Sequence, residues 1–159
     1  MTDINSSASD GPGTANAATS IRVARSGMAE AAPDKVWTII GDFCGIADWH
    51  FAVERCVLSD EGGVRTPTLT LVGGATLVEA EVERDDAART YSYKIVEGPL
   101  PVSNYLSTLS VRPATGAGSS EIAWTGSFDA KGVSVDEASG IIAGIYESGI
   151  AALVAKAAE

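Results

Sequence analysis

The sequence has few of the residues from which metal centres and nucleophilic sites are built. Its 159 residues contain one histidine, His50, and two cysteines, Cys44 and Cys56, with no Cys-x-x-Cys pair. A transition-metal site needs several such ligands close together, so we expect no metal and no other cofactor. Phosphate-binding glycine runs and serine-histidine-aspartate arrangements are also missing, which argues against P-loop and serine-hydrolase chemistry.

Positive charge is also scarce. The chain contains 11 Lys and Arg but 21 Asp and Glu, which gives a formal net charge of −10. Such a chain cannot neutralise a row of phosphates, so we expect neither a nucleic-acid partner nor an anionic membrane surface. The longest apolar runs fall short of the roughly 20 residues that a membrane helix needs.

The two cysteines are expected to be free thiols, because a chain of this length can bury a sufficient hydrophobic core without a disulfide bond. Free thiols fit a reducing compartment, and the cytoplasm is the predicted location. Residues 1–19 contain almost nothing large and apolar and are expected to form a disordered tail. Residues 20–159 are then a single domain.

The last stretch, residues 135–157, predicts one long helix. Ser134 and Glu137 form an S-x-x-E capping box at its start. An apolar stripe at helical spacing follows, formed by Ile141, Ile142, Ile145, Tyr146, Ile150, Leu153 and Val154. Gly144 and Gly149 interrupt it, although each costs about 1 kcal/mol against alanine. We expect Gly149 either to keep a space open under the helix or to let the sheet come close.

Most of the remaining chain alternates like strands. A strand is expected at 20–31, short helices at 33–41 and 42–49, and six strands at 51–59, 64–72, 75–84, 89–97, 102–112 and 121–129. Consecutive hairpins predict a meander, and the apolar stripe of the final helix needs a sheet to cover it. The prediction is therefore α+β, a seven-stranded curved antiparallel sheet wrapped around the C-terminal helix, with a gap where ligand pockets form.

The order of elements, with the segment DKVWTIIGDFCGIADWH after the first strand, resembles the START/birch-pollen-allergen (SRPBCC) superfamily. Two further segments are similar to its small bacterial polyketide cyclase/dehydrase-like members: DDAARTYSYKIVEGPLPVSNYLSTLSV and the ending GIYESGIAALVAKA. The resemblance spans roughly residues 20–157 and implies a helix-grip fold. It also implies a cavity for a small hydrophobic molecule between sheet and helix, and a homodimer is left open.

His50 is a candidate general base, since the pKa of histidine lies near neutrality. The alternative is a partly buried histidine that fixes the end of the second short helix. A nucleophilic pair of Cys44 and His50 is conceivable, but nothing in the sequence marks Cys44 as activated.

Four aromatic residues, Tyr91, Tyr93, Tyr105 and Trp124, share the apolar phase of neighbouring strands. They predict either a pocket wall that offers hydroxyl and indole groups or plain core packing. Tyr93 and Tyr105 are the candidate catalytic hydroxyls beside His50. The candidate ligand-binding residues are Trp49, Glu79, Tyr91, Trp124, Phe128, Ile145 and Gly149.

Glu79 and Glu81 lie in the middle of a predicted strand. They face inward if Leu77 does, and solvent if Val78, Ala80 and Val82 face inward. The three apolar residues favour solvent-facing glutamates. A buried one would have a raised pKa and could act as an acid or a base.

Three functions remain open: a binding protein for a small hydrophobic or aromatic molecule, a cofactor-free cyclase or dehydratase-like enzyme, and an interaction module with a filled interior. The sequence contains no strong acid–base pair, so binding is placed slightly ahead of catalysis.

Overall fold

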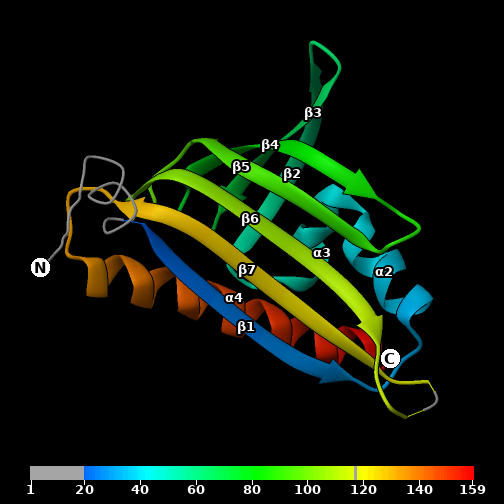
Figure 1. The fold of residues 1–159 in the computed structure, drawn as a ribbon. Helices are drawn as coiled ribbons and strands as arrows, with labels where there is room; N and C mark the ends of the chain where they lie inside the picture. The colour runs from blue at the N-terminus through cyan, green and yellow to red at the C-terminus, as the bar shows by residue number, and fades with distance from the viewer. Residues whose placement is uncertain (1–19, 117) are drawn as a thin grey trace, which may run out of the picture.

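A computed structural model describes residues 20–116 and 118–159; the expected tail at 1–19 lies outside them. The chain forms one strand, a set of short helices, six more strands and a final helix (Figure 1). The elements are β1 (Ile21–Ala29), α2 (Pro33–Gly41), η2 (Phe43–Gly45), α3 (Ile46–Trp49), β2 (Val53–Glu61), β3 (Val64–Leu71), β4 (Thr76–Asp85), β5 (Thr90–Glu97), β6 (Val102–Pro113), β7 (Ser120–Ala130) and α4 (Val135–Ala157).

All seven strands form one antiparallel sheet in the order β1-β7-β6-β5-β4-β3-β2. The last six strands are a meander, and β1 closes the other edge by pairing with β7 along its whole length. Helix α4 runs along one face of the sheet beside β1 and β7, while α2 and α3 lie near one end (Figure 1). This confirms the predicted helix-grip architecture.

The turn between β3 and β4 follows the glycine pair that the sequence marks. Gly73 and Gly74 both adopt positive φ angles, of 104° and 98°. Side chains rarely tolerate such angles, so glycine is required at this tight connection. The second predicted helix differs from the expectation, because it divides at Gly45 into the one-turn segments η2 and α3.

Helix α4 begins as its capping residues predict. The Ser134 side chain accepts a hydrogen bond from the Glu137 backbone N–H at 3.0 Å. Among the described residues this is also the one helix long and apolar enough to cross a membrane. Its buried residues, including Ile142, Tyr146 and Leu153, pack in the main hydrophobic core, which accounts for its apolar character.

The two cysteines form a disulfide, so the expectation of free thiols is wrong. Cys44 lies on η2 and Cys56 on β2, 12 positions apart in sequence, with their Cα atoms 5.4 Å apart. No local pattern indicates this proximity, because it depends on how the short helices fold back onto the edge of the sheet. The bond also removes the nucleophilic Cys44–His50 pair from consideration, since a disulfide sulfur is not a thiolate.

Candidate functional site

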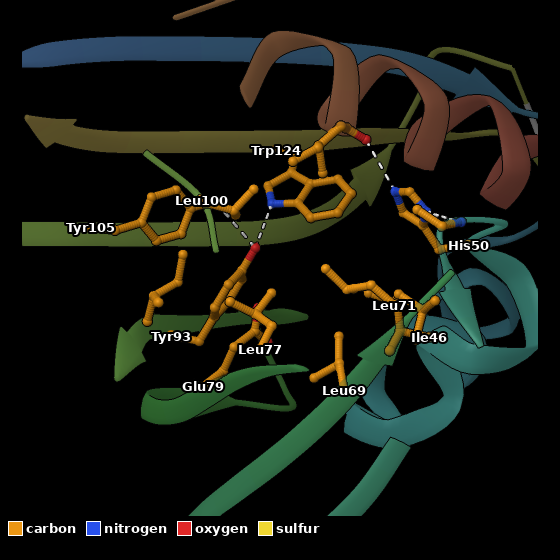
Figure 2. A pocket seen from close by; sticks show the side chains of 14 residues that line it. Ile46, His50, Leu69, Leu71, Leu77, Glu79, Tyr93, Leu100, Tyr105 and Trp124 are labelled. Atoms are coloured by element: carbon orange, nitrogen blue, oxygen red, sulfur yellow. Dashed lines mark hydrogen bonds between the residues drawn. The ribbon is translucent and has the colours of Figure 1, made fainter. Parts of the chain in front are cut away.

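A pocket opens between the sheet, α3 and α4 (Figure 2). Its volume is about 90 Å³. Its wall is largely carbon, and the lining residues are Ile46, His50, Ala52, Val53, Leu69, Leu71, Leu77, Glu79, Tyr93, Ile95, Leu100, Tyr105, Trp124 and Ile145. Apolar walls with a few polar groups are typical of small-molecule sites.

Glu79 is the acidic group in this lining. Its side chain comes from β4 and the residue is only 8 % exposed. Among the described residues no hydrogen bond or ion pair reaches its carboxyl group. Burial raises the pKa of Glu79 to about 8, because the charged form loses its hydration in an apolar surrounding. The group is therefore mostly neutral at pH 7.

The inward orientation of Glu79 corrects the expectation that this residue faces solvent. Leu77 is buried, and Glu79 two positions later shares its face. The register against β5 shifts between Val78 and Glu79 and again between Glu81 and Glu83, so simple alternation does not hold along β4. Glu81 is mostly buried as well, where its carboxylate accepts a hydrogen bond from Arg84 at 2.7 Å.

A buried hydrogen-bond network joins the aromatic residues of the pocket wall to Tyr146 of α4. The Tyr146 hydroxyl lies 2.6 Å from the Tyr105 hydroxyl and 3.0 Å from Ser107 Oγ. The Trp124 indole N–H is shared between Ser107 Oγ, at 3.0 Å, and the Tyr93 hydroxyl, at 3.1 Å. The network ties α4 to β5, β6 and β7 and fixes the aromatic side of the pocket.

The donor and acceptor roles in this network follow from the Thr125 carbonyl, which can only accept. Ser107 donates its single hydroxyl hydrogen to the Thr125 carbonyl at 2.9 Å, so it accepts from Tyr146. Tyr146 in turn accepts from Tyr105, and Tyr105 lies 3.5 Å from the Tyr93 hydroxyl. Burial raises the pKa of Tyr93, Tyr105 and Tyr146, so all three stay protonated.

Both ring nitrogens of His50 are engaged with backbone. Nδ1 accepts from the Ala52 N–H at 3.2 Å, so Nε2 carries the hydrogen and donates it to the Ile145 carbonyl at 3.2 Å (Figure 2). Burial lowers the pKa of His50 against the opposing effect of the Ile145 carbonyl. This arrangement leaves no nitrogen to accept a proton and favours the structural alternative over a general base.

Gly149 marks close packing. A Cβ on this residue would lie 2.5 Å from Trp124 Cζ3 and 3.0 Å from His50 Cδ2. The space beneath this part of α4 is therefore filled by Trp124 and His50. Gly144 has no neighbouring atom within 4 Å of such a Cβ. Gly149 therefore lets the sheet come close to α4 and does not keep a space open beneath the helix.

The remaining predicted ligand-binding residues lie beside the pocket. Trp49 packs against Trp124, with ring centroids 6.3 Å apart, and Phe128 stacks on Tyr105 at 5.9 Å. Tyr91 is buried against Trp37, under the guanidinium of Arg84. These three belong to the core that supports the wall and do not line the cavity.

Three further residues that shape the site were not picked out as site residues from the sequence. Tyr146 was assigned only to the apolar stripe, and Ser107 carried no signal within its strand. Gly126 lies where a Cβ would collide with the Tyr146 hydroxyl. A glycine in the middle of a strand often marks such a close approach, which is the one sign that was available. Among the described residues there is also no group of three or more side chains suited to hold a metal ion.

The fold and the pocket together define a helix-grip protein with an internal cavity. A family model described as "polyketide cyclase / dehydrase and lipid transport" matches residues 20–158. The chain therefore belongs to this family. A search of curated proteins gave no match.

Several solved structures are similar to this chain. XoxI from Bacillus cereus is 34% identical, with 87% of this chain and 96% of that chain covered and a TM-score of 0.82. An uncharacterised protein from Bacillus thuringiensis is 33% identical, with 87% and 100% covered and a TM-score of 0.83. The Zhui aromatase/cyclase from Streptomyces sp. R1128 is 20% identical, with 87% and 94% covered and a TM-score of 0.72, which shows a shared fold.

Proposed function

We propose that the protein binds a small hydrophobic or aromatic molecule in the pocket between the sheet and α4. The observation that carries the proposal is an apolar cavity whose wall also holds a buried carboxyl, Glu79, and a tyrosine hydroxyl, Tyr93. Apolar walls supply affinity, and a few placed polar groups orient the ligand. A filled interior, the third function considered, does not fit this cavity.

The size of the pocket limits the ligand. Its volume of about 90 Å³ is below the range of roughly 300–1,000 Å³ of common small-molecule sites. A cavity of about 150 Å³ holds benzene. The pocket is smaller than that, so a ligand with one ring enters only if a lining side chain such as the half-buried Ile46 moves aside.

Native mass spectrometry of the purified protein tests this proposal. We expect a co-purifying molecule with a single-ring or similarly small apolar body. The variant Leu69→Trp fills the cavity and should lose the adduct, whereas Val82→Trp, at an exposed position outside the lining, should keep it. An adduct that survives in Leu69→Trp would place the ligand elsewhere, and protein that neither carries a ligand nor takes one up on exposure to small aromatics would reject the proposal.

A second candidate is a cofactor-free cyclase or dehydratase-like enzyme that uses Tyr93, Tyr105 and His50 in the same cavity. The observation in its favour is Glu79, whose pKa of about 8 keeps a proton available at pH 7 for a leaving hydroxyl group. Binding ranks first because both His50 nitrogens are occupied, so His50 is not available as a partner base. Incubating the captured molecule with the protein and with Glu79→Gln distinguishes the two: loss of water from the molecule with the parent alone would indicate the enzyme.

A further inference from the structure

We propose that Glu79 makes the pocket selective for uncharged ligands that carry an oxygen acceptor, because its neutral carboxyl donates a hydrogen bond to a carbonyl or similar oxygen. This inference rests on the proposed function and adds to it the chemical class of the ligand and the residue that selects it.

The surroundings of the carboxyl group carry the inference. Glu79 projects into a lining that includes Leu69, Leu77 and Ile95, and these supply only carbon. Among the described residues no hydrogen-bond donor or cation is paired with it. A buried polar group without a partner costs free energy, and that cost is recovered when a ligand supplies the missing partner.

The titratable groups that face Glu79 supply no positive charge. They are Tyr91 and Tyr93 from β5, Tyr105 from β6, Tyr146 from α4 and His50 at the end of α3. Burial keeps the four tyrosines protonated and His50 uncharged. On β4 itself, the carboxylate of Glu81 is paired with Arg84 at 2.7 Å and with Arg65 at 3.9 Å.

The pocket should therefore bind anionic, cationic and neutral ligands with different affinities. A carboxylate ligand would bring a charge into a cavity that has no cation to pair with it. An amine would be bound as an ion pair only after Glu79 had lost its proton, and both charges would lose hydration. A neutral oxygen acceptor needs no change of charge, since the protonated Glu79 can donate to it directly.

Three probes of nearly one shape separate these cases. Acetophenone carries a carbonyl, α-methylstyrene replaces that oxygen with CH₂, and 1-phenylethylamine replaces the carbonyl with a protonated amine. Their affinities are measured by calorimetry for the parent, Glu79→Gln and Glu79→Leu, with thermal melts to establish that each variant is folded. Glu79→Gln keeps a neutral donor of the same size, and Glu79→Leu removes it.

We expect the parent to bind acetophenone about tenfold more tightly than α-methylstyrene, the worth of one hydrogen bond. Its affinity for acetophenone should fall roughly tenfold for each pH unit above the Glu79 pKa of about 8. Glu79→Gln should keep the preference without that pH dependence, and Glu79→Leu should lose the preference.

Equal binding of acetophenone and α-methylstyrene by the parent and Glu79→Leu would overturn the inference and leave the proposed binding function intact. Tighter binding of 1-phenylethylamine, with an affinity that rises as pH increases towards 8, would also overturn it and assign Glu79 to cations. If none of the three probes binds, the binding function fails for ligands of this size, and the inference fails with it.

Discussion

Gly149 of α4 and Trp124 of β7 lie so close that a Cβ on the glycine would come within 2.5 Å of the indole ring. His50 fills the other side of the same contact. The absence of a side chain at Gly149 thus allows the helix to approach the sheet and sets the position of Trp124, which lines the pocket.

Gly149→Ala should therefore destabilise the protein by about 1–3 kcal/mol, because the added methyl group overpacks the contact with Trp124 and His50. Gly144→Ala is the matched control on the same helix. No atom lies within 4 Å of its new methyl group, and helix propensity should raise stability by somewhat under 1 kcal/mol. Urea unfolding of both variants measures the difference. Equal stability of the two would mean that the helix does not approach the sheet as closely as described.

The hydroxyl of Tyr146 should be worth about 1–3 kcal/mol to stability. Tyr146→Phe removes the bridge between Tyr105 and Ser107 and leaves buried polar groups without a partner. Ser107→Ala should show a comparable loss, and the double variant should lose less than the sum because the two hydroxyls act in one network. Denaturant unfolding of the parent and the three variants completes a double-mutant cycle, which measures the coupling between the two hydroxyls. Strict additivity would contradict a shared network.

The architecture was predictable because it depends on the spacing of apolar residues and on the capping and turn residues between the elements. The capping residues Ser134 and Glu137 and the stripe through Tyr146 placed α4 correctly, and the glycine pair at 73–74 placed a hairpin. The order of β2 to β7 then followed from consecutive hairpins, whereas the pairing of β1 with β7 did not. These signals are local in sequence, and the fold is the arrangement in which they agree.

The site was less predictable because it depends on contacts between distant elements. Glu79 faces the pocket together with Leu77, but the register shifts in β4 break the regular alternation, so that Ala80 is also buried and Val82 is exposed. The Cys44–Cys56 bond depends on the path of η2 beside β2. The backbone partners of His50 come from Ala52 and Ile145, the second of which is 95 positions away.

The disulfide should contribute about 2–4 kcal/mol to stability by restricting the unfolded chain. A reducing agent should lower the melting temperature of the parent to that of the double variant Cys44→Ala/Cys56→Ala. The variant itself should not respond to the reducing agent, which controls for other effects of the reagent. A parent that melts at the same temperature with and without reductant would show that the bond contributes nothing to stability.

Stability should fall as the pH rises from about 4.5 to about 8 because of Glu79. The folded state holds the proton of Glu79 up to a pKa of about 8, whereas the unfolded chain releases it near the ordinary glutamate pKa of 4.5. The folded state thus binds more protons in this interval, and each unit of pKa difference is worth about 1.4 kcal/mol. The full loss is at most roughly 5 kcal/mol, and the dependence ends above pH 8.

Glu79→Gln should remove this component of the pH dependence, because glutamine does not titrate. Denaturant unfolding of parent and variant between about pH 5 and pH 9 measures it. The difference between the two proteins should change by more than 1 kcal/mol across that interval, with the variant relatively more stable at high pH. A constant difference would contradict the buried, unpaired state of Glu79.

The most direct test of binding in the pocket is an NMR titration of methyl-labelled protein with acetophenone. The methyl groups of Leu69, Leu77, Ile95 and Ile145 line the cavity, whereas those of Ile122 and Leu153 are fully buried in the core away from it. Saturable shifts of the four lining residues, with little change at the two core residues, are the result that we predict. Shifts confined to exposed residues such as Val57 and Leu58, or no saturable shift at all, would contradict a ligand-binding cavity.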